Sequence, residues 1–384
     1  MSINDTTKQS DSGRHGQGAR APGKLILSGE HSVVYGAPAL AVAVQHFTEV
    51  WFTPLHKTGG LFTAFESLSP SAFYPFEALK SFREGLDRRF DQFLRGEMPV
   101  QKILQRPDDL AIYTLTSLLP MIPMPGRSSG LGLPVPGQLS SRTDMPLGAG
   151  MGSSAAVVAA TIVLYEHLLG SPQSTEDRFE KVRFCERLQH GKGSAIDASA
   201  VVFGGLNRVQ GDRVTPQALS AQHSLAQAQG WYWVQLGTPL SKTGECVAKV
   251  REEHSGDHAL WREFEACTEA FTQIIAEDQD PREIIRENQT LLNRIGVVPH
   301  AADRFADAVE AMGGAAKVSG AGAVRGEHAG VMLVYQPDAA AMATLMESYP
   351  ERRWERLRIS MAGAHLLAGE APAIAAPSPA ISAQ

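Results

Sequence analysis

The chain has 384 residues, 43% of them hydrophobic, and carries a formal net charge of −6. This length allows a sizeable core and favours two domains, and the acidic balance without a long basic run argues against a nucleic-acid partner. The three cysteines have neither metal-ligand nor disulfide-framework spacing, and no apolar stretch suits a signal peptide or a bilayer span, so we expect a cytoplasmic protein.

Composition divides the chain into four stretches. Residues 1–19 are polar, residues 369–384 are rich in Ala, Pro and Ser, and both are predicted to be disordered tails. A polar segment rich in Gln, Ala and Ser ends near residue 230. We therefore place an N-terminal ATP-binding and catalytic domain at 20–220 and a C-terminal domain at 221–368.

Strands and helices are predicted to alternate through the first domain. Alternating and β-branched stretches predict strands at 25–27, 45–53 and 137–143. Apolar periodicity predicts helices at 76–95, 108–119, 155–169 and 175–189, the last with Ser174 as its N-cap.

The second domain is predicted to be rich in helices. The same patterns predict strands at 231–236, 330–335 and 357–361 and helices at 245–251, 261–276, 281–295, 301–312 and 339–346. A second Gly-rich segment, 317–326, precedes the middle strand of this set.

A glycine-rich loop precedes the most apolar predicted helix. Gly148, Gly150 and Gly152 alternate and are followed at once by Ser153 and Ser154. Bare backbone N–H groups that lead into a helix N-terminus favour a phosphate. The loop lacks the lysine of a Walker A motif. The alternative is a Gly-rich turn that only caps a core helix.

Two acidic residues stand in unusual places. Glu186 lies four residues after Val182, on the apolar face of its helix, where a carboxylate needs a partner or a ligand. The alternative is a marginal charge paired with Arg183 or Arg187. Asp197 lies among glycines, which suggests a tight turn, and its simplest role there would be a helix N-cap.

Read together, these motifs resemble those of the GHMP small-molecule kinases. Residues 22–36 resemble the first signature of that family, in the Gly-Glu-His form found in mevalonate kinases. Residues 146–156 resemble its phosphate loop and residues 317–322 its third motif. Glu186, eleven positions before Asp197, also fits the mevalonate kinase pattern. The resemblance covers roughly residues 20–365.

This resemblance implies an α+β two-domain GHMP kinase fold. The N-terminal domain would be like ribosomal protein S5, the C-terminal domain ferredoxin-like, and the active site would lie between them. The implied reaction is ATP-dependent phosphorylation of the primary hydroxyl of mevalonate to 5-phosphomevalonate, in isoprenoid precursor synthesis, with Mg²⁺ as cofactor. ATP and a small alcohol are the expected partners, without nucleic acid or membrane, and a homodimer is left open.

The resemblance also assigns roles to residues. Asp197 would accept the proton of the substrate hydroxyl, and Lys24 would keep it ionised and neutralise the moving phosphoryl group. Ser154 and Glu186 would bind Mg²⁺. The ATP contacts would be Lys24, Thr143, Gly148, Ala149, Gly150, Met151, Gly152, Ser153 and Ser154. The substrate contacts would be Lys24, Glu30, His31, Asp197 and Thr243.

Two departures from the family pattern keep other acceptors open. Ala323, Val324 and Arg325 replace a run of glycines in the third motif, and Lys192 belongs to a pair that replaces an Asn-Pro-like one. Both cations would suit a more acidic acceptor such as phosphomevalonate, and a sugar is another alternative. A nucleotide-binding regulator without catalysis, or a decarboxylase-type relative, is disfavoured because the lysine and both acidic residues are present.

Overall fold

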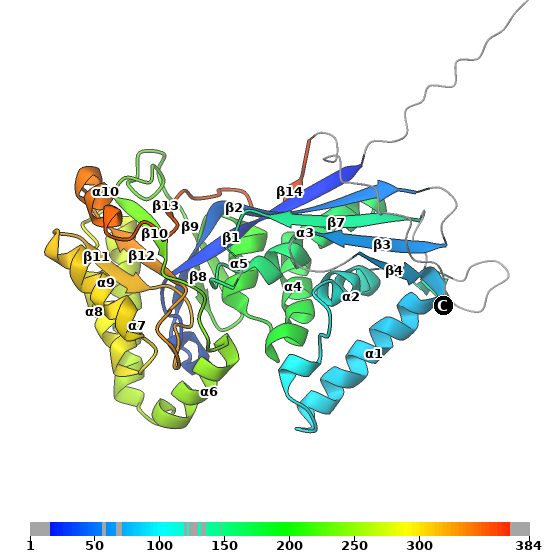
Figure 1. Cartoon of the computed structure of the whole chain (residues 1–384), viewed down its shortest axis with the longest axis horizontal. Coiled ribbons are helices and arrows are strands. Elements are labelled where there is room, and N and C mark those ends of the chain that lie inside the picture. Colours follow the sequence, from blue (N-terminus) through cyan, green and yellow to red (C-terminus); the bar gives the residue numbers. More distant parts are fainter. Residues whose placement is uncertain are drawn as a thin grey trace, which may run out of the picture.

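The computed structural model describes residues 16–55, 59–66, 71–118, 121–122, 130–131, 136–146 and 148–368. Figure 1 shows a large sheet with helices beneath it and, beside it, a smaller sheet with its own helices. The two sheets are formed by different parts of the chain, apart from one short strand near the C-terminal end.

The larger sheet has eight strands. Its main path runs β14-β1-β2-β7-β3-β4, and β8 pairs with both β2 and β9. All of its neighbours are antiparallel except the pair β3 and β7. The strands are β1 (Gln17–Ser28), β2 (Ala39–Pro54), β3 (Gly60–Phe65), β4 (Ala72–Pro75), β7 (Gly137–Thr143), β8 (Leu206–Gln210), β9 (Arg213–Gln217) and β14 (His365–Leu366). A separate hairpin pairs β5 (Met121–Ile122) with β6 (Gly130–Leu131).

Helices cover one face of this sheet (Figure 1). They are α1 (Phe76–Leu94), α2 (Asp109–Leu118), α3 (Ser153–Leu168), α4 (Thr175–His190) and α5 (Ala195–Phe203). The central helix, α3, packs against β1 and β2 and against α2 and α4, so it is enclosed on several sides. This position explains why its sequence is apolar all round rather than along one stripe.

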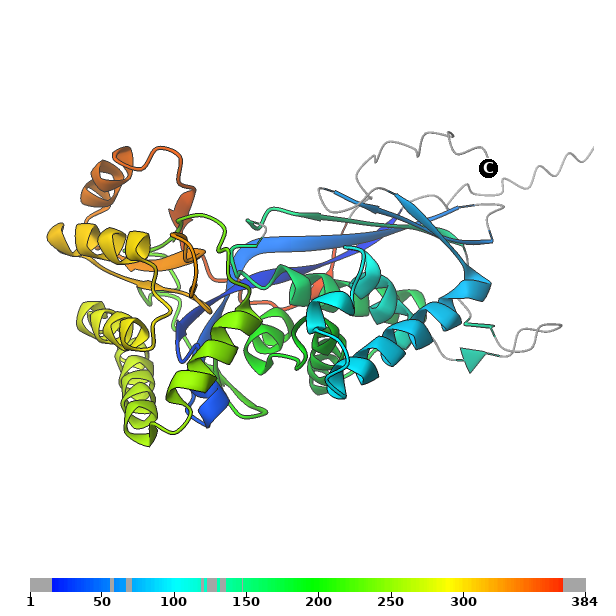
Figure 2. The same cartoon turned by 60° about the horizontal axis from the view of Figure 1, so that its bottom comes forward.

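The smaller sheet has four antiparallel strands in the order β11-β12-β10-β13. These are β10 (Trp231–Gln235), β11 (Ala315–Val318), β12 (Val331–Tyr335) and β13 (Trp354–Arg356). Its helices are α6 (Thr243–His254), α7 (His258–Ala276), α8 (Arg282–Arg294), α9 (His300–Ala311) and α10 (Ala339–Glu347). Figure 2 shows α6 between the helices of the two halves.

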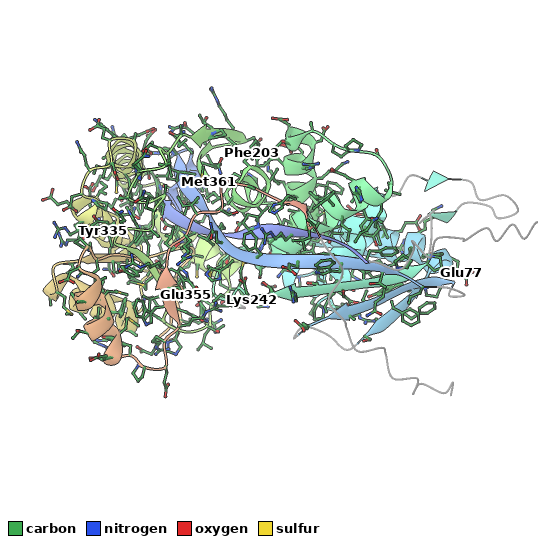
Figure 3. The ribbon with its side chains drawn as sticks, turned by 90° about the horizontal axis from the view of Figure 1, so that it is seen from above. Glu77, Phe203, Lys242, Tyr335, Glu355 and Met361 are labelled. Atoms are coloured by element: carbon green, nitrogen blue, oxygen red, sulfur yellow. The ribbon has the colours of Figure 1, made fainter. Side chains whose placement is uncertain are left out.

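The predicted strand at 357–361 is wrong. The strand that pairs with β10 is β13, which ends at Arg356, and only a single bridge joins Ile359 to Val44 of β2. After Arg356 the chain leaves the smaller sheet and crosses to the larger one, where β14 pairs with β1. Figure 3 shows this crossing from above, between the labelled residues Glu355 and Met361.

The first strand begins earlier than composition predicted. β1 starts at Gln17, so its first residues lie within the stretch 1–19 that we expected to be a tail. The glycine at 18 has a packing role, because a Cβ there would lie 2.4 Å from the ring of Trp51. No helix in the described ranges is long and apolar enough to cross a membrane.

Candidate active site

The Gly loop bends back onto the first strand at the start of α3. Gly148, Gly150 and Gly152 all adopt left-handed backbone conformations, with φ of 73°, 83° and 76°. Alternating glycines are what such a backbone requires, since side chains disfavour this region. The Met151 carbonyl accepts a hydrogen bond of 2.9 Å from the N–H of Lys24. The exposed N–H groups of the α3 N-terminus therefore lie beside a lysine, as a phosphate site requires.

Lys24 and Asp197 form a buried ion pair next to this loop. Their Nζ and Oδ1 atoms are 3.4 Å apart, with the lysine side chain 6% exposed and that of the aspartate 21% exposed. A Cβ at Gly152 would lie 3.0 Å from Lys24 Cγ and 3.3 Å from Asp197 Oδ1. The pair thus lies directly against the tip of the Gly loop, and only a glycine leaves both side chains room.

Asp197 is part of a helix, so the predicted tight turn is wrong. It is the third residue of α5, and Ser194 is the N-cap, whose hydroxyl accepts the Asp197 N–H at 3.2 Å. Burial alone would raise the pKa of Asp197. The ammonium of Lys24, the Ser194 hydroxyl and His190 together outweigh burial and hold the pKa below its ordinary value. The carboxylate is therefore ionised and able to accept a proton at neutral pH.

Glu186 contacts a hydroxyl and an imidazole rather than an arginine. The Ser154 hydroxyl donates to Glu186 Oε2 at 3.1 Å, and His190 Nε2 lies 3.5 Å from the same oxygen. The alternative partners are engaged elsewhere, Arg183 with Glu180 and Asp212 and Arg187 with Asp87. The interpretation of Glu186 as a marginal charge paired with an arginine is therefore wrong.

The Ser154–Glu186 pair fits a magnesium ion. Glu186 is 1% exposed, and its Oε1 is buried without a hydrogen-bond partner. An orphaned carboxylate oxygen is costly unless a ligand completes its shell. A carboxylate and a hydroxyl supply the hard oxygens that Mg²⁺ takes from a protein, while phosphates and waters complete its coordination. Among the described residues no cluster of three or more His, Cys, Asp or Glu side chains forms a metal cage.

Two residues of the first signature are tied to the third motif. Glu30 forms an ion pair with Lys317 of β11, and both side chains are almost fully buried. His31 Nε2 lies 3.1 Å from the Ala321 carbonyl, so Nε2 carries the proton and donates. Burial lowers the pKa of His31 to about 4, so its ring is neutral. These contacts join the Gly-Glu-His segment to the smaller sheet.

The pKa of Lys317 also depends on the charge of Lys24. Burial lowers the pKa of Lys317; Glu30 acts against that effect, and the positive charge of Lys24 adds to it. Because buried charges are screened much less than exposed ones, Lys24 can influence Lys317 without contacting it.

The two predicted threonines have less direct placements. The Thr143 hydroxyl donates to the Phe47 carbonyl at 3.2 Å and accepts from the Met145 N–H and the Thr48 hydroxyl. It already holds the start of the Gly loop, so its contact with ATP stays a prediction. Thr243 is the first residue of α6 and is exposed, and no side-chain hydrogen bond involves it within the described residues.

Of Arg325 and Lys192, the two cations that depart from the family pattern, only Arg325 forms an ion pair within the described residues. Arg325 pairs with Glu245 at 2.8 Å on the surface. Lys192 is exposed, and its side chain makes no ion pair in the part of the chain that is described. It lies between His190, the last residue of α4, and Ser194, the N-cap of α5, so its ammonium lies near the helix that carries Asp197.

Sequence reasoning missed His190 and Lys317 as members of the site. Burial acts to lower the pKa of His190, but the carboxylates of Glu186 and Asp197 outweigh it and the pKa lies above its ordinary value. Its position four residues after Glu186 was the available signal, because such residues share a helix face. For Lys317 the signal was a lysine within an otherwise apolar strand.

Comparison with known proteins finds similarity to GHMP kinases. Residues 127–205 match the family described as GHMP kinases N terminal domain. A mevalonate kinase from Archaeoglobus fulgidus is 27% identical over 315 residues, which are 79% of this chain and 88% of the relative. The chain therefore contains a GHMP kinase N-terminal domain, and its similarity to a mevalonate kinase extends over most of its length.

Other GHMP kinases are similar over different lengths. A mevalonate kinase from Thermococcus onnurineus is 32% identical over 187 residues, which are 49% of each chain, so the match spans about half of that relative. A phosphomevalonate kinase from a Streptomyces species is 28% identical over 377 residues, 87% of this chain and 93% of the relative. These relatives thus include proteins named for two different acceptors, mevalonate and phosphomevalonate.

The fold agrees with solved members of the superfamily. The structure of the Methanococcus jannaschii mevalonate kinase superposes with a TM-score of 0.69 at 18% identity, covering 91% of this chain and 99% of the other. This likeness confirms the predicted α+β GHMP kinase fold. The domain boundaries at residues 220 and 368 stay predictions.

Proposed function

We propose that this protein transfers the γ-phosphoryl group of ATP to the primary hydroxyl of mevalonate. The observation that carries the proposal is the Lys24–Asp197 ion pair at the tip of the Gly loop. Its Nζ and Oδ1 atoms are 3.4 Å apart. An ionised carboxylate beside a cation and a helix N-terminus supplies the groups that phosphoryl transfer to an alcohol needs. The relatives named mevalonate kinase and the Gly29-Glu30-His31 segment support mevalonate as the acceptor.

The residues divide the chemistry between them. The Gly loop and the first turn of α3 would bind the ATP phosphates, leaving the γ-phosphorus beside Lys24. Asp197 would take the proton of the acceptor hydroxyl as its oxygen forms a bond to that phosphorus. The bond from phosphorus to the β-phosphate oxygen breaks, and ADP leaves. Lys24 would offset the negative charge that gathers on the transferring group.

Ser154 and Glu186 would hold Mg²⁺, which when bound neutralises phosphate charge. The second oxygen of Glu186, buried and unpartnered, supports this assignment. His190 lies against the other oxygen of that carboxylate and would orient it.

Phosphomevalonate is the second candidate acceptor. The Streptomyces phosphomevalonate kinase is similar in sequence over 87% of this chain, compared with 79% for the Archaeoglobus mevalonate kinase. Lys192 adds an exposed, unpaired ammonium near the start of α5, which would suit a phosphate on the acceptor.

An acceptor panel tests the proposal. ADP release with Mg·ATP is measured for mevalonate, phosphomevalonate, galactose and homoserine, with the phosphorylated product identified by mass spectrometry. We expect the highest kcat/KM with mevalonate. A clear preference for phosphomevalonate would replace the acceptor and keep the reaction class, and no ADP release with any alcohol would reject the kinase assignment.

A further inference from the structure

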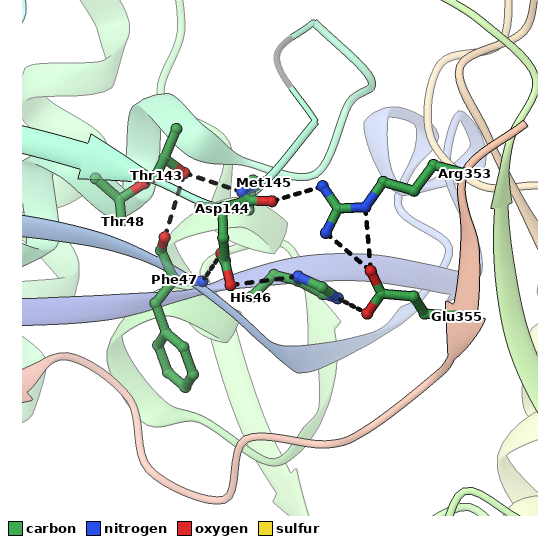
Figure 4. Close-up of polar contacts among 8 residues, drawn as sticks. All are labelled: His46, Phe47, Thr48, Thr143, Asp144, Met145, Arg353 and Glu355. Atoms are coloured by element: carbon green, nitrogen blue, oxygen red, sulfur yellow. Dashed lines mark hydrogen bonds and ion pairs between the residues drawn. The ribbon is translucent and has the colours of Figure 1, made fainter. Parts of the chain in front are cut away.

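A closed ring of polar contacts lies where the Gly loop leaves the larger sheet (Figure 4). His46 of β2 lies 3.6 Å from the Asp144 carboxylate and 3.3 Å from that of Glu355. Arg353 donates to Glu355 at 2.8 Å and, with its other terminal nitrogen, to the Asp144 carbonyl at 2.8 Å. The ring therefore joins two strands of the larger sheet to the β13 edge of the smaller one.

Backbone hydrogen bonds fix Asp144 and Arg353, the two residues on opposite sides of this ring. The Asp144 carboxylate accepts the Phe47 N–H at 2.6 Å, and the Arg353 carbonyl accepts the Gln235 N–H at 2.8 Å. The buried ring of Trp233, also in β10, packs against His46 at 5.1 Å and lies under the Arg353 guanidinium at 5.4 Å. His46 is thus the buried member of the ring, whereas the side chains of Arg353 and Glu355 are 41% and 43% exposed.

Asp144 is the last residue before the Gly loop segment. Its neighbour Thr143 caps the Met145 N–H, and Met145 packs against Gly23, where a Cβ would lie 2.5 Å from the Met145 sulfur. Gly23 in turn precedes Lys24. A displacement of Asp144 would therefore shift the start of the loop toward or away from the catalytic lysine.

The smaller sheet also touches the loop further along. A Cβ at Gly148 would lie 3.1 Å from Thr238, and one at Gly330 would lie 2.9 Å from the Ala149 carbonyl. Contacts with the smaller sheet consequently flank the loop at its start and its middle. Of these, only the Arg353 contact with Asp144 is a charge-assisted hydrogen bond.

We propose that Arg353 is a positioning residue for the nucleotide: from the smaller sheet it fixes the start of the Gly loop, with His46 and Glu355 holding it in place. This inference rests on the proposed function only in taking the Gly loop as the ATP phosphate site. Arg353 acts through Asp144 and touches neither acceptor nor phosphate. Its loss should weaken nucleotide binding and leave the acceptor site and the Lys24–Asp197 pair unaltered.

The test compares Arg353→Ala with Arg358→Ala. Arg358 is an exposed arginine on the same segment, lining the same surface hollow as His46 and Asp144, but it has no side-chain partner among the described residues. Calorimetric titration of each full-length variant with Mg·ADP should give a Kd roughly tenfold higher for Arg353→Ala, the size expected for one charge-assisted hydrogen bond, and an unchanged Kd for Arg358→Ala.

Two further readouts separate positioning from general damage. In steady state, Arg353→Ala should raise KM for ATP while kcat and KM for the acceptor stay within about twofold. Arg353→Lys, which can still donate to the Asp144 carbonyl, should recover part of the affinity. Amide hydrogen exchange should rise in the segment 145–154 and stay unchanged in α5.

Equal nucleotide affinity in Arg353→Ala and Arg358→Ala would overturn the inference. So would a loss of kcat in Arg353→Ala, or faster amide hydrogen exchange in its α5. If Arg353→Ala does not fold, Glu355→Ala carries the same test, since it removes the carboxylate to which the Arg353 guanidinium donates. A wild-type protein that binds no nucleotide would instead reject the proposed function itself.

Discussion

Lys24 Nζ lies 3.4 Å from Asp197 Oδ1, and a Cβ at Gly152 would lie 3.0 Å from Lys24 Cγ and 3.3 Å from that same Asp197 oxygen. One ion pair thereby connects three segments, the first strand, the Gly loop and α5. This relationship gives the carboxylate a lowered pKa despite burial and places a cation beside the α3 N-terminus. The predictions below follow from this ion pair and from the contacts Ser154–Glu186 and Glu30–Lys317.

Removing the lysine should move the acid limb of the pH profile. Asp197 must be ionised to accept a proton, and its pKa lies below the ordinary value because Lys24, Ser194 and His190 outweigh burial. Lys24→Met removes the charge that opposes the effect of burial, so the pKa of Asp197 should rise. As the pH is lowered, the residual kcat of this variant should therefore begin to fall at a higher pH than that of wild type. Lys181→Met on α4 is the control, and kcat against pH is the measurement. Coincident acid limbs would show that another group controls the profile.

Glu186→Gln should raise the Mg²⁺ concentration needed for half-maximal activity by roughly tenfold or more, because the amide keeps the shape of the side chain but loses its charge. The matched control is Glu180→Gln, on the same helix but exposed and paired with Arg183. Titration of activity with Mg²⁺ at fixed ATP is the measurement. The same titration curve for both variants would leave Glu186 with a structural role only.

The Glu30–Lys317 pair should matter for stability more than any surface pair. Both side chains are within 1% of full burial, so Lys317→Met leaves an isolated buried carboxylate and should lower the free energy of unfolding by about 3–5 kcal/mol. Adding Glu30→Gln should restore much of this loss because no unpaired charge remains. Arg294→Ala, which breaks an exposed pair with Glu263, should cost no more than about 1 kcal/mol. Denaturant unfolding measures all three, and equal losses for the buried and exposed pairs would contradict the argument.

Local signals in the sequence predicted much of the fold. Ser174 accepts the Asp177 N–H, as a predicted N-cap should, and β7 has the bounds 137–143 that alternation indicated. The strand expected at 357–361 failed because strand pairing depends on distant neighbours: β10 pairs with the residues just before it. Residue patterns near Asp197 suggested a turn because glycines outweighed Ser194, the cap that starts α5.

The contacts between residues of the site were less predictable than the sequence motifs that contain them. Glu186 was expected to need a partner, and the family resemblance, rather than any local pattern, predicted that it would lie close to Ser154, which is 32 residues away. The Glu30–Lys317 pair spans 287 residues and forms only because the third motif packs against the first. Long-range contacts of this kind follow from the tertiary fold rather than from periodicity.

The central claim is that Asp197 accepts the proton of an alcohol during transfer from ATP. Asp197→Asn keeps the size of the side chain and cannot take a proton, so kcat for ADP release with mevalonate should fall at least roughly 10²-fold while Mg·ADP binding changes little. Its effect should also be non-additive with that of Lys24→Met, because both residues serve one hydroxyl. Asp212→Asn, an exposed carboxylate paired with Arg183, is the control.

The decisive measurement is therefore the kcat of purified Asp197→Asn with saturating Mg·ATP and mevalonate, relative to wild type and to Asp212→Asn. The account predicts a loss of at least roughly 10²-fold in Asp197→Asn alone, with nucleotide affinity retained. An Asp197→Asn protein that keeps most of its kcat would contradict the account, because Asp197 would then be only a residue of the first turn of α5.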